Sequence, residues 1–265
     1  MVRFVGICQY DGSNYSGFQS QKNAISIQDK LEFAIASIGA LEGRINYAGR
    51  TDAGVHATGQ IFDFLTNNDR DKDQWHKGIN SLLPNDISVS SIQKVPEKFH
   101  SRFDAINRTY SYVIYTGKAE PIFFRNYVYW EKNKLDLDIM RDEASNLIGT
   151  HNFDSFRSSK CTSKNPVRTI KSIDITKKEN FIIITLCANA YLYNMVRIIV
   201  GTLLEISKGS SKNINAILNS QDRKNAGNTA KAKGLFFTGA DYKEIDLDTS
   251  SSISSPLSFL ISSRI

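Results

Sequence analysis

The stretches VRFVGICQY at residues 2–10 and SIQDKLEFAIASIGA at residues 26–40 decide the fold, because they indicate a strand followed by an amphipathic helix. In the second stretch, apolar residues recur every three or four positions on one helical face: Ile27, Leu31, Ile35 and Ile38. Ser26 can cap this helix at its start, and Gly39 can end it. The chain therefore begins with alternating strand and helix.

The same two patterns recur along the rest of the chain. Strands are expected at residues 44–49, 59–65, 87–95, 109–115, 126–130, 169–175 and 181–188. Helices are expected at residues 71–82, 136–148, 191–207 and 212–219. Few spacings suit a βαβ unit, which favours antiparallel sheets with helices on one face. We predict an α/β (α+β) fold made of two similar halves, each with a largely antiparallel sheet flanked by helices.

The order of elements repeats near the middle of the chain, so we expect an N-terminal half at residues 1–105 and a C-terminal half at residues 106–245. Sites tend to lie in clefts between such halves, and we expect the active site there. Residues 246–265 are rich in serine and show neither pattern. We expect them to form a flexible tail.

The composition and net charge indicate which class of protein this chain belongs to. The chain has 265 residues, 41% of them apolar, and a net charge of +6, which favours a globular protein with a polyanionic partner such as nucleic acid. Cys8, Cys161 and Cys187 are too far apart and too few for a disulfide framework. No signal peptide or membrane span is apparent, so we expect a cytoplasmic protein.

The loop GRTDAGVHA at residues 49–57 is the most informative stretch, because it holds an arginine, an aspartate and a histidine within seven residues and has two glycines that let the backbone turn sharply. No GK[ST] follows, so it is not a phosphate loop. His56 has no second ligand at helical spacing, so we expect no metal site. From spacing alone, an ordinary hairpin in which Asp52 bonds the turn backbone is the better interpretation.

Three further stretches carry candidate residues. Aromatic residues of YDGSNYSGFQSQ, at residues 10–21, could stack on bases or pin the loop to the core. Tyr110, in the strand RTYSYVIY, could stack on an extruded base, although core packing is more common for such a residue. Arg197 stands in an apolar helix and is expected to pair with a carboxylate, unless its side chain snorkels to the surface.

In order along about nine tenths of the chain, these motifs resemble the tRNA pseudouridine synthase A family. The matching pieces are YDGSNYSGFQ at 10–19, SIQDKLE at 26–32, GRTDAGVHA at 49–57, LLPNDI at 82–87, FHSRFDA at 99–105, RTYSY at 108–112, HNFDSF at 151–156, YLYNMVRIIVGTLLE at 191–205 and GLFF at 234–237. One such piece would be weak, but nine in order make accident very unlikely.

The resemblance implies an isomerase that converts uridine to pseudouridine at positions 38, 39 and 40 in the anticodon stem-loop of tRNA. It implies that Asp52 is the catalytic aspartate, that Arg50 holds the displaced nucleotide, and that Tyr110 contacts the target base. Arg197 matches the arginine that pairs with the catalytic aspartate. It also implies a homodimer that uses no metal and no organic cofactor.

The chain departs from the family pattern at three positions. Phe18 stands where the family often has tryptophan, Tyr191 replaces a usual phenylalanine, and Lys231 replaces the proline of TAPAxGL. None of these changes removes a charged catalytic group. They bear on substrate affinity more than on the chemistry.

Two basic segments suit phosphate contacts, although a solvated surface is the better interpretation of any single lysine. They are Arg157, Lys160, Lys164, Arg168 and Lys171, and then Arg223, Lys224, Lys231 and Lys233. Two rival functions stay open at this point. One is a non-catalytic tRNA-binding protein or RNA chaperone, and the other is an aspartate-dependent hydrolase of small nucleosides.

Overall fold

The computed structural model describes residues 1–247. They divide into two compact units, which are unit 1 (residues 1–108 and the strand from Phe236) and unit 2 (residues 109–235). Of the predicted tail, residues 248–265 lie outside the described part. None of the helices among residues 1–247 is long and apolar enough to cross a membrane.

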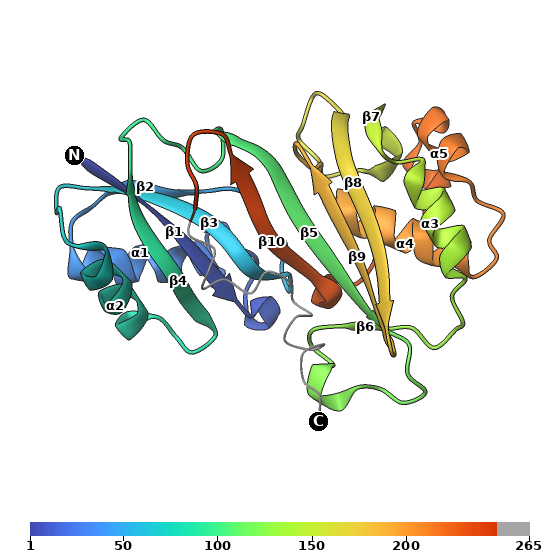
Figure 1. The fold of residues 1–265 in the computed structure, drawn as a ribbon, viewed down its shortest axis with the longest axis horizontal. Coiled ribbons are helices and arrows are strands. Elements are labelled where there is room, and N and C mark those ends of the chain that lie inside the picture. Colours follow the sequence, from blue (N-terminus) through green and yellow to red (C-terminus); the bar gives the residue numbers. More distant parts are fainter. Residues whose placement is uncertain (248–265) are drawn as a thin grey trace. The chain divides into compact units, whose positions relative to one another are not determined.

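Unit 1 is built on a sheet in which the strands follow the order β4-β1-β3-β10, with β2 paired to β3 (Figure 1). Its strands are β1 (Val2–Tyr10), β2 (Leu41–Tyr47), β3 (His56–Thr66), β4 (Ile87–Val95) and β10 (Leu235–Tyr242). Its helices are α1 (Ile27–Ile38) and α2 (Lys72–Leu82), with a 3-10 turn η1 (Gly12–Asn14). The pairs β1–β3, β1–β4 and β2–β3 are antiparallel, and β10 joins β3 in parallel.

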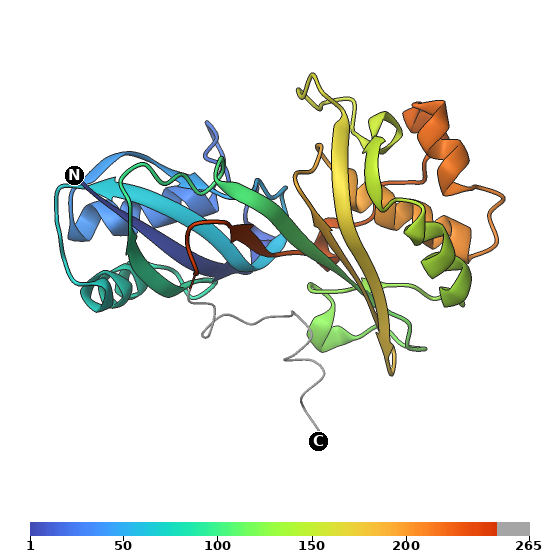
Figure 2. The ribbon, with the colours of Figure 1, turned by 45° about the horizontal axis from the view of Figure 1, so that its top comes forward.

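The helices of unit 1 form where local signals predict them. The Ser26 hydroxyl accepts a hydrogen bond from the Asp29 amide at 3.1 Å and so caps α1, and Gly39 ends that helix. Helix α1 packs beside α2, and both cover the sheet of unit 1 (Figures 1 and 2). The fully buried Trp75 of α2 meets the ring of Phe64 edge-on, with the ring centroids 5.0 Å apart.

In unit 2 the strands follow the order β5-β9-β8-β7, with β6 paired to β5. Its strands are β5 (Ala105–Tyr115), which starts in unit 1, β6 (Tyr129–Trp130), β7 (Gly149–Asn152), β8 (Val167–Lys178) and β9 (Phe181–Ala188). Its helices are α3 (Leu137–Ser145), α4 (Met195–Ser207) and α5 (Ile214–Ser220). The 3-10 turns are η2 (Ile122–Phe124), η3 (Asp154–Phe156), η4 (Arg223–Asn225) and η5 (Ala232–Gly234). Helix α3 packs on both α4 and β8.

The predicted α/β class with largely antiparallel strands is confirmed, and the differences have local causes. The helix expected from residue 191 begins at Met195, because Asn194 adopts a left-handed conformation with φ 62°. Strands β7 and β10 were not predicted. The residues of β10 were assigned to the C-terminal half, but parallel pairing of Phe236 with His56 places this strand in unit 1.

Candidate active site

Asp52 lies in the loop that joins β2 to β3, directly before a tight turn. The Val55 amide donates to the Asp52 carbonyl at 3.1 Å and closes the turn. Gly54 has φ +74°, a conformation that favours glycine at the third position of a type II turn. Asp52 is half-buried and Arg50 is exposed, so this loop presents a carboxyl group and a guanidinium cation within three residues.

The segment 10–18 braces this loop from one side. The Tyr10 hydroxyl and the Thr51 hydroxyl are hydrogen-bonded at 2.7 Å in a buried position. The Phe18 amide donates to the Thr51 carbonyl at 3.2 Å, and the Gly54 amide donates to the Tyr15 carbonyl at 3.4 Å. The residues on either side of Asp52 are therefore fixed by partners outside the loop.

Two glycines of segment 10–18 allow the backbones to approach this closely. A Cβ on Gly12 would lie 2.0 Å from the Val55 carbonyl oxygen. A Cβ on Gly17 would lie 2.6 Å from the Thr51 carbonyl oxygen, and Gly17 has φ +100°. Any other residue at either position would push segment 10–18 away from residues 49–57, the aspartate loop.

His56 closes the loop at the start of β3. It is 1% exposed, and its ring stacks on Phe236 with the centroids 4.9 Å apart. Its Nδ1 lies 3.1 Å from the Gly12 amide nitrogen, which donates to it, and 3.2 Å from Asp11 Oδ1. His56 thus serves as an acceptor that holds segment 10–18. Residues 1–247 contain no group of three or more His, Cys, Asp or Glu side chains that could hold a metal ion.

The aromatic residues of segment 10–18 pin it to the core. Phe18 is fully buried and packs on Tyr47, with the ring centroids 4.5 Å apart. Tyr15 is buried and donates its hydroxyl to Asp86 at 2.6 Å. Burial and that hydrogen bond hold the pKa of Tyr15 above its usual value, so the phenol keeps its proton. The structure therefore favours core packing over base stacking for Phe18 and Tyr15.

Tyr110 and Tyr112 are both buried in β5 of unit 2. Tyr112 is fully buried in the core, and its hydroxyl donates to the Lys231 carbonyl at 2.9 Å. Tyr110 is 7% exposed and meets the ring of Tyr191 edge-on at 5.1 Å. The Tyr191 hydroxyl donates to the Leu186 carbonyl at 2.8 Å, so the oxygen that distinguishes it from phenylalanine is hydrogen-bonded. Burial raises the pKa of Tyr191 well above its usual value.

Arg197 lies on α4 of unit 2 and is held by neighbours within that unit. Its Nε donates to the Ala230 carbonyl at 2.8 Å, and the Ala230 amide donates back to the Arg197 carbonyl at 3.0 Å. Its Nη1 donates to Asn194 Oδ1 at 3.1 Å. These bonds fix the guanidinium plane. The pairing of Arg197 with Asp52 stays a prediction.

The candidate residues thus fall into two sets. Arg50 and Asp52 share one loop of unit 1, while Tyr110 and Arg197 stand on a strand and a helix of unit 2. Two buried or half-buried polar residues that sequence reasoning did not single out, Gln60 and Arg108, bond the backbone next to the aspartate loop. Their role becomes visible only from their hydrogen bonds to Gly49 and Ala48 in the folded chain.

Comparisons with known proteins identify the family of this chain. The family model described as tRNA pseudouridine synthase matches residues 7–104 and 144–243. A protein named tRNA pseudouridine synthase A from Francisella tularensis subsp. tularensis is 42% identical over 238 residues, which are 89% of this chain and 92% of that protein. One of the same name from Buchnera aphidicola subsp. Schizaphis graminum is 43% identical over 235 residues, 88% of this chain and 89% of the relative.

The chain belongs to the tRNA pseudouridine synthase family. The matched ranges include Arg50, Asp52 and Arg197, and Tyr110 lies between them. A solved H/ACA RNP bound to a substrate RNA is 10% identical, with a TM-score of 0.38, over 77% of this chain and 43% of that one. A similarity this low has no bearing on the function of this synthase.

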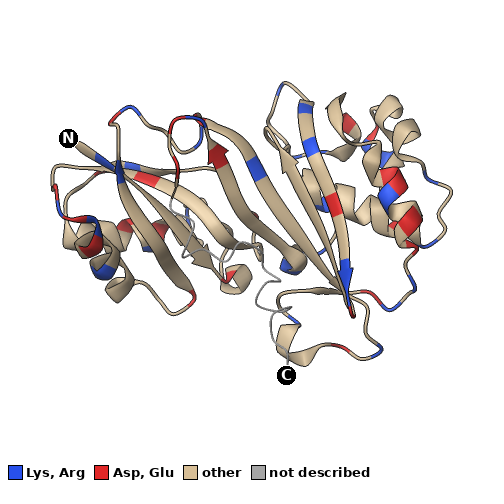
Figure 3. Cartoon of the chain, in the orientation of Figure 1, with Lys and Arg blue, Asp and Glu red and all other residues tan. Residues whose placement is uncertain are grey.

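The basic segments of this synthase are partly ordered by their own arginines. Arg157 pairs with Asp154 at 2.8 Å, and Arg168 donates to the Asn165 carbonyl at 3.0 Å. Lysines of the same segment stay exposed: Lys160, Lys164 and Lys171. Figure 3 shows the basic residues along β8, where the sequence VRTIKSIDITKK contains a single acid. Unit 2 therefore carries exposed cations beside arginines that bond to their own segment.

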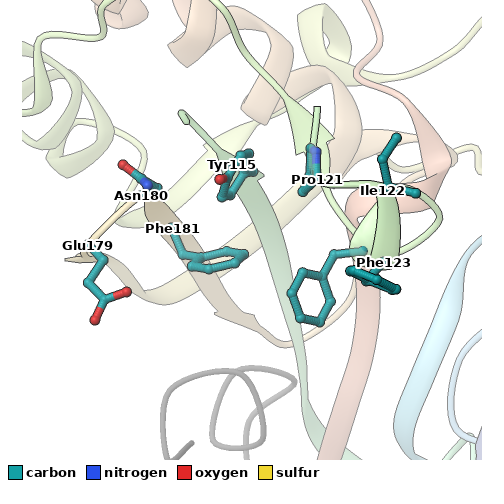
Figure 4. Close-up of a pocket in the computed structure, with 8 residues that line it drawn as sticks. Tyr115, Pro121, Ile122, Phe123, Glu179, Asn180 and Phe181 are labelled. Carbon is teal, nitrogen blue, oxygen red and sulfur yellow. The ribbon is translucent and has the colours of Figure 1, made fainter. Parts of the chain in front are cut away.

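A shallow pocket of about 260 Å³ lies elsewhere in unit 2 and contains none of the candidate residues (Figure 4). It is lined by Tyr115, Pro121, Ile122, Phe123, Phe124, Glu179, Asn180 and Phe181. Phe123 is 91% exposed and Ile122 is 59% exposed beside it. Exposed apolar groups of this kind mark interaction surfaces more often than catalytic sites.

The close approach of Gly12 to the Val55 carbonyl can be tested by substitution. Gly12→Ala should lower the free energy of unfolding by about 1–3 kcal/mol, the usual cost of overpacking, because the added Cβ meets a backbone oxygen. Urea unfolding followed by circular dichroism measures this change. The control is Gly239→Ala in β10, whose Cβ would meet nothing within 4 Å and should cost less than about 0.5 kcal/mol. Equal effects of the two changes would contradict the close packing of segment 10–18 on the loop.

Proposed function

We propose that this synthase converts uridine to pseudouridine in tRNA, at positions 38, 39 and 40 of the anticodon stem-loop. The observation that carries the proposal is the GRTDAGVHA loop, in which Asp52 sits at a braced turn of a chain 42% identical to proteins named tRNA pseudouridine synthase A. Family membership supports action on tRNA. The three positions follow from the resemblance alone.

The reaction needs a carboxylate rather than an electron carrier. Isomerisation breaks the N-glycosidic bond of uridine and forms a C–C bond from the same base to the same sugar, so no net electrons enter or leave. Asp52 can act as a nucleophile towards the sugar carbon or the pyrimidine ring, or as a base that removes a sugar proton. The freed base must turn before it rejoins, so the site has to hold it and exclude water.

The other candidate residues bind and position the nucleotide in this proposal. Arg50 is exposed two residues before Asp52, where a guanidinium can hold the backbone of a displaced nucleotide. Tyr110 presents an aromatic ring to the target base, with Tyr191 packed against it. The plane of Arg197 is fixed by Ala230 and Asn194, and the resemblance assigns this residue the role of partner to the catalytic carboxylate.

Binding tRNA requires the target uridine to leave its stack, which costs a few kcal/mol. Contacts from lysines to phosphate can offset that cost, and the exposed Lys160, Lys164 and Lys171 suit this role. Binding would then weaken as salt rises.

We also propose a cytoplasmic homodimer. The three cysteines Cys8, Cys161 and Cys187 are free, as expected in a reducing compartment. For the dimer, unit 2 offers an apolar surface where Ile122 and Phe123 stand exposed beside the shallow pocket. The homodimer itself is implied by the resemblance.

The alternative is a tRNA-binding protein or RNA chaperone without catalysis. Such a protein has no use for an aspartate at a turn held on both sides by hydrogen bonds. The intact set of Arg50, Asp52, Tyr110 and Arg197 favours the enzyme over this alternative.

A substitution at Asp52 separates the two functions. Asp52→Asn should lower tritium release from tRNA labelled at uracil C5 by at least about 100-fold, since it removes both nucleophile and base. Its affinity for tRNA should stay close to that of the wild type. The control is Asp69→Asn, which changes an exposed aspartate paired with Lys94 and should leave release unchanged.

Each other outcome has a definite meaning. Tritium release by Asp52→Asn at the wild-type rate would remove Asp52 from the chemistry. Binding of tRNA without release by the wild type would favour the chaperone.

A further inference from the structure

Gln60 is a fully buried polar side chain in β3 that makes two hydrogen bonds to one residue of the aspartate loop. Its Nε2 donates to the Gly49 carbonyl at 2.8 Å, and its Oε1 accepts from the Gly49 amide at 3.4 Å. A side-chain amide that bonds both the amide and the carbonyl of one residue replaces the pair of hydrogen bonds that a neighbouring strand would make. It therefore sets the position and direction of that residue. Gly49 is the first residue of the loop that carries Asp52.

Arg108 bonds to Ala48, the residue directly before Gly49. Its Nε donates to the Ala48 carbonyl at 3.1 Å, and its Nη1 donates to the Ala105 carbonyl at 2.7 Å. Its Nη2 also donates to the Arg102 carbonyl. One guanidinium therefore ties the end of β2 to residues 102–105, and Ala48 and Gly49 are both held by side chains from outside the loop.

The sheet around Gln60 leaves it little room to move. Gly59, its neighbour in β3, lies so close to β10 that a Cβ there would be 2.4 Å from the Thr238 carbonyl oxygen. On the other side of β3, Gln60 is in register with the fully buried Cys8 of β1. The backbone of β3 at Gln60 is thus held between β1 and β10, and the side-chain amide of Gln60 links it to Gly49.

We infer that Gln60 is a positioning residue of the reaction, with Arg108 in support: their bonds to Gly49 and Ala48 set where the loop starts and so where Asp52 points. This rests on the proposed function of Asp52. Reacting atoms must stay close to their productive geometry, and small displacements reduce turnover strongly. An apolar side chain at position 60 could fill the same volume, so packing alone does not require glutamine there.

The chain contains a matched control. Asn80 of α2 bonds both backbone groups of Val89 in β4, with its Nδ2 donating to the carbonyl at 2.8 Å and its Oδ1 accepting from the amide at 2.8 Å. This is the same two-point bond in the same unit, but it holds a strand remote in sequence from the aspartate loop. The Val89 carbonyl also contacts His76 Nε2 at 2.9 Å.

The test compares Gln60→Leu with Asn80→Leu in the full-length protein, at a temperature where circular dichroism shows both to be folded. Gln60→Leu should lower kcat for pseudouridine formation at saturating tRNA by at least about tenfold, with a smaller change in KM. Hydrogen exchange, followed by mass spectrometry, should become faster at residues 49–57. Asn80→Leu should keep the wild-type kcat and speed exchange at residues 87–95 instead.

Two results would overturn the inference. One is wild-type kcat and wild-type exchange of the loop in Gln60→Leu, and the other is an equal loss of kcat in Asn80→Leu. If Gln60→Leu does not fold, Arg108→Lys replaces it, because lysine keeps the charge but cannot reach three carbonyls. If the wild type makes no pseudouridine, the proposed function fails, while the exchange at residues 49–57 still tests the two-point bond by itself.

Discussion

The hydrogen bonding of a short polar loop is the constraint on which the rest of this structure depends. A loop that carries a carboxylate into a partly buried site must find partners for its own amides and carbonyls, because unpaired buried polar groups cost about 1–3 kcal/mol each. Here the partners come from several elements. Segment 10–18 supplies backbone groups and the Tyr10 hydroxyl, while Gln60 and Arg108 supply side chains. The backbone of the loop around Asp52 is thereby held by groups outside the loop.

This requirement explains features of unit 1 that have no other evident purpose. Glycine at positions 12 and 17 lets two backbones touch, and burial of Phe18 and Tyr15 holds segment 10–18 in place. The parallel pairing of β10 with β3 sets Phe236 against His56, the residue that accepts from Gly12. An electrostatic site that is organised in advance needs less rearrangement during reaction, which is the main way in which such sites lower barriers.

Much of the fold could be predicted, because many elements depend on local signals. Helix α1 begins and ends where Ser26 and Gly39 indicate, and the period of its apolar residues needs no distant partner. Strand β10 was missed because it depends on pairing with residues about 180 positions earlier in the chain. The start of α4 was placed four residues too early, since nothing in the local pattern reveals that Asn194 is left-handed.

The candidate site also combines residues that local sequence reveals with residues that only distant contacts reveal. Asp52 and Arg50 stand in a motif that can be recognised from sequence, although spacing alone favours an ordinary hairpin. Gln60 lies in an alternating strand where a polar residue suggests only an outward position, and its bonds to Gly49 appear only when the two strands are paired. The roles of Tyr110 and Arg197 rest on the family resemblance.

The central claim is that this chain makes pseudouridine in the anticodon arm of tRNA. The most direct test is to incubate unmodified tRNA transcripts with the purified protein, label pseudouridine with a carbodiimide, and map it by primer extension. Stops are expected that correspond to positions 38, 39 and 40 wherever a transcript has uridine there. Bound tRNA without any stops, or stops confined to other parts of the molecule, would contradict it.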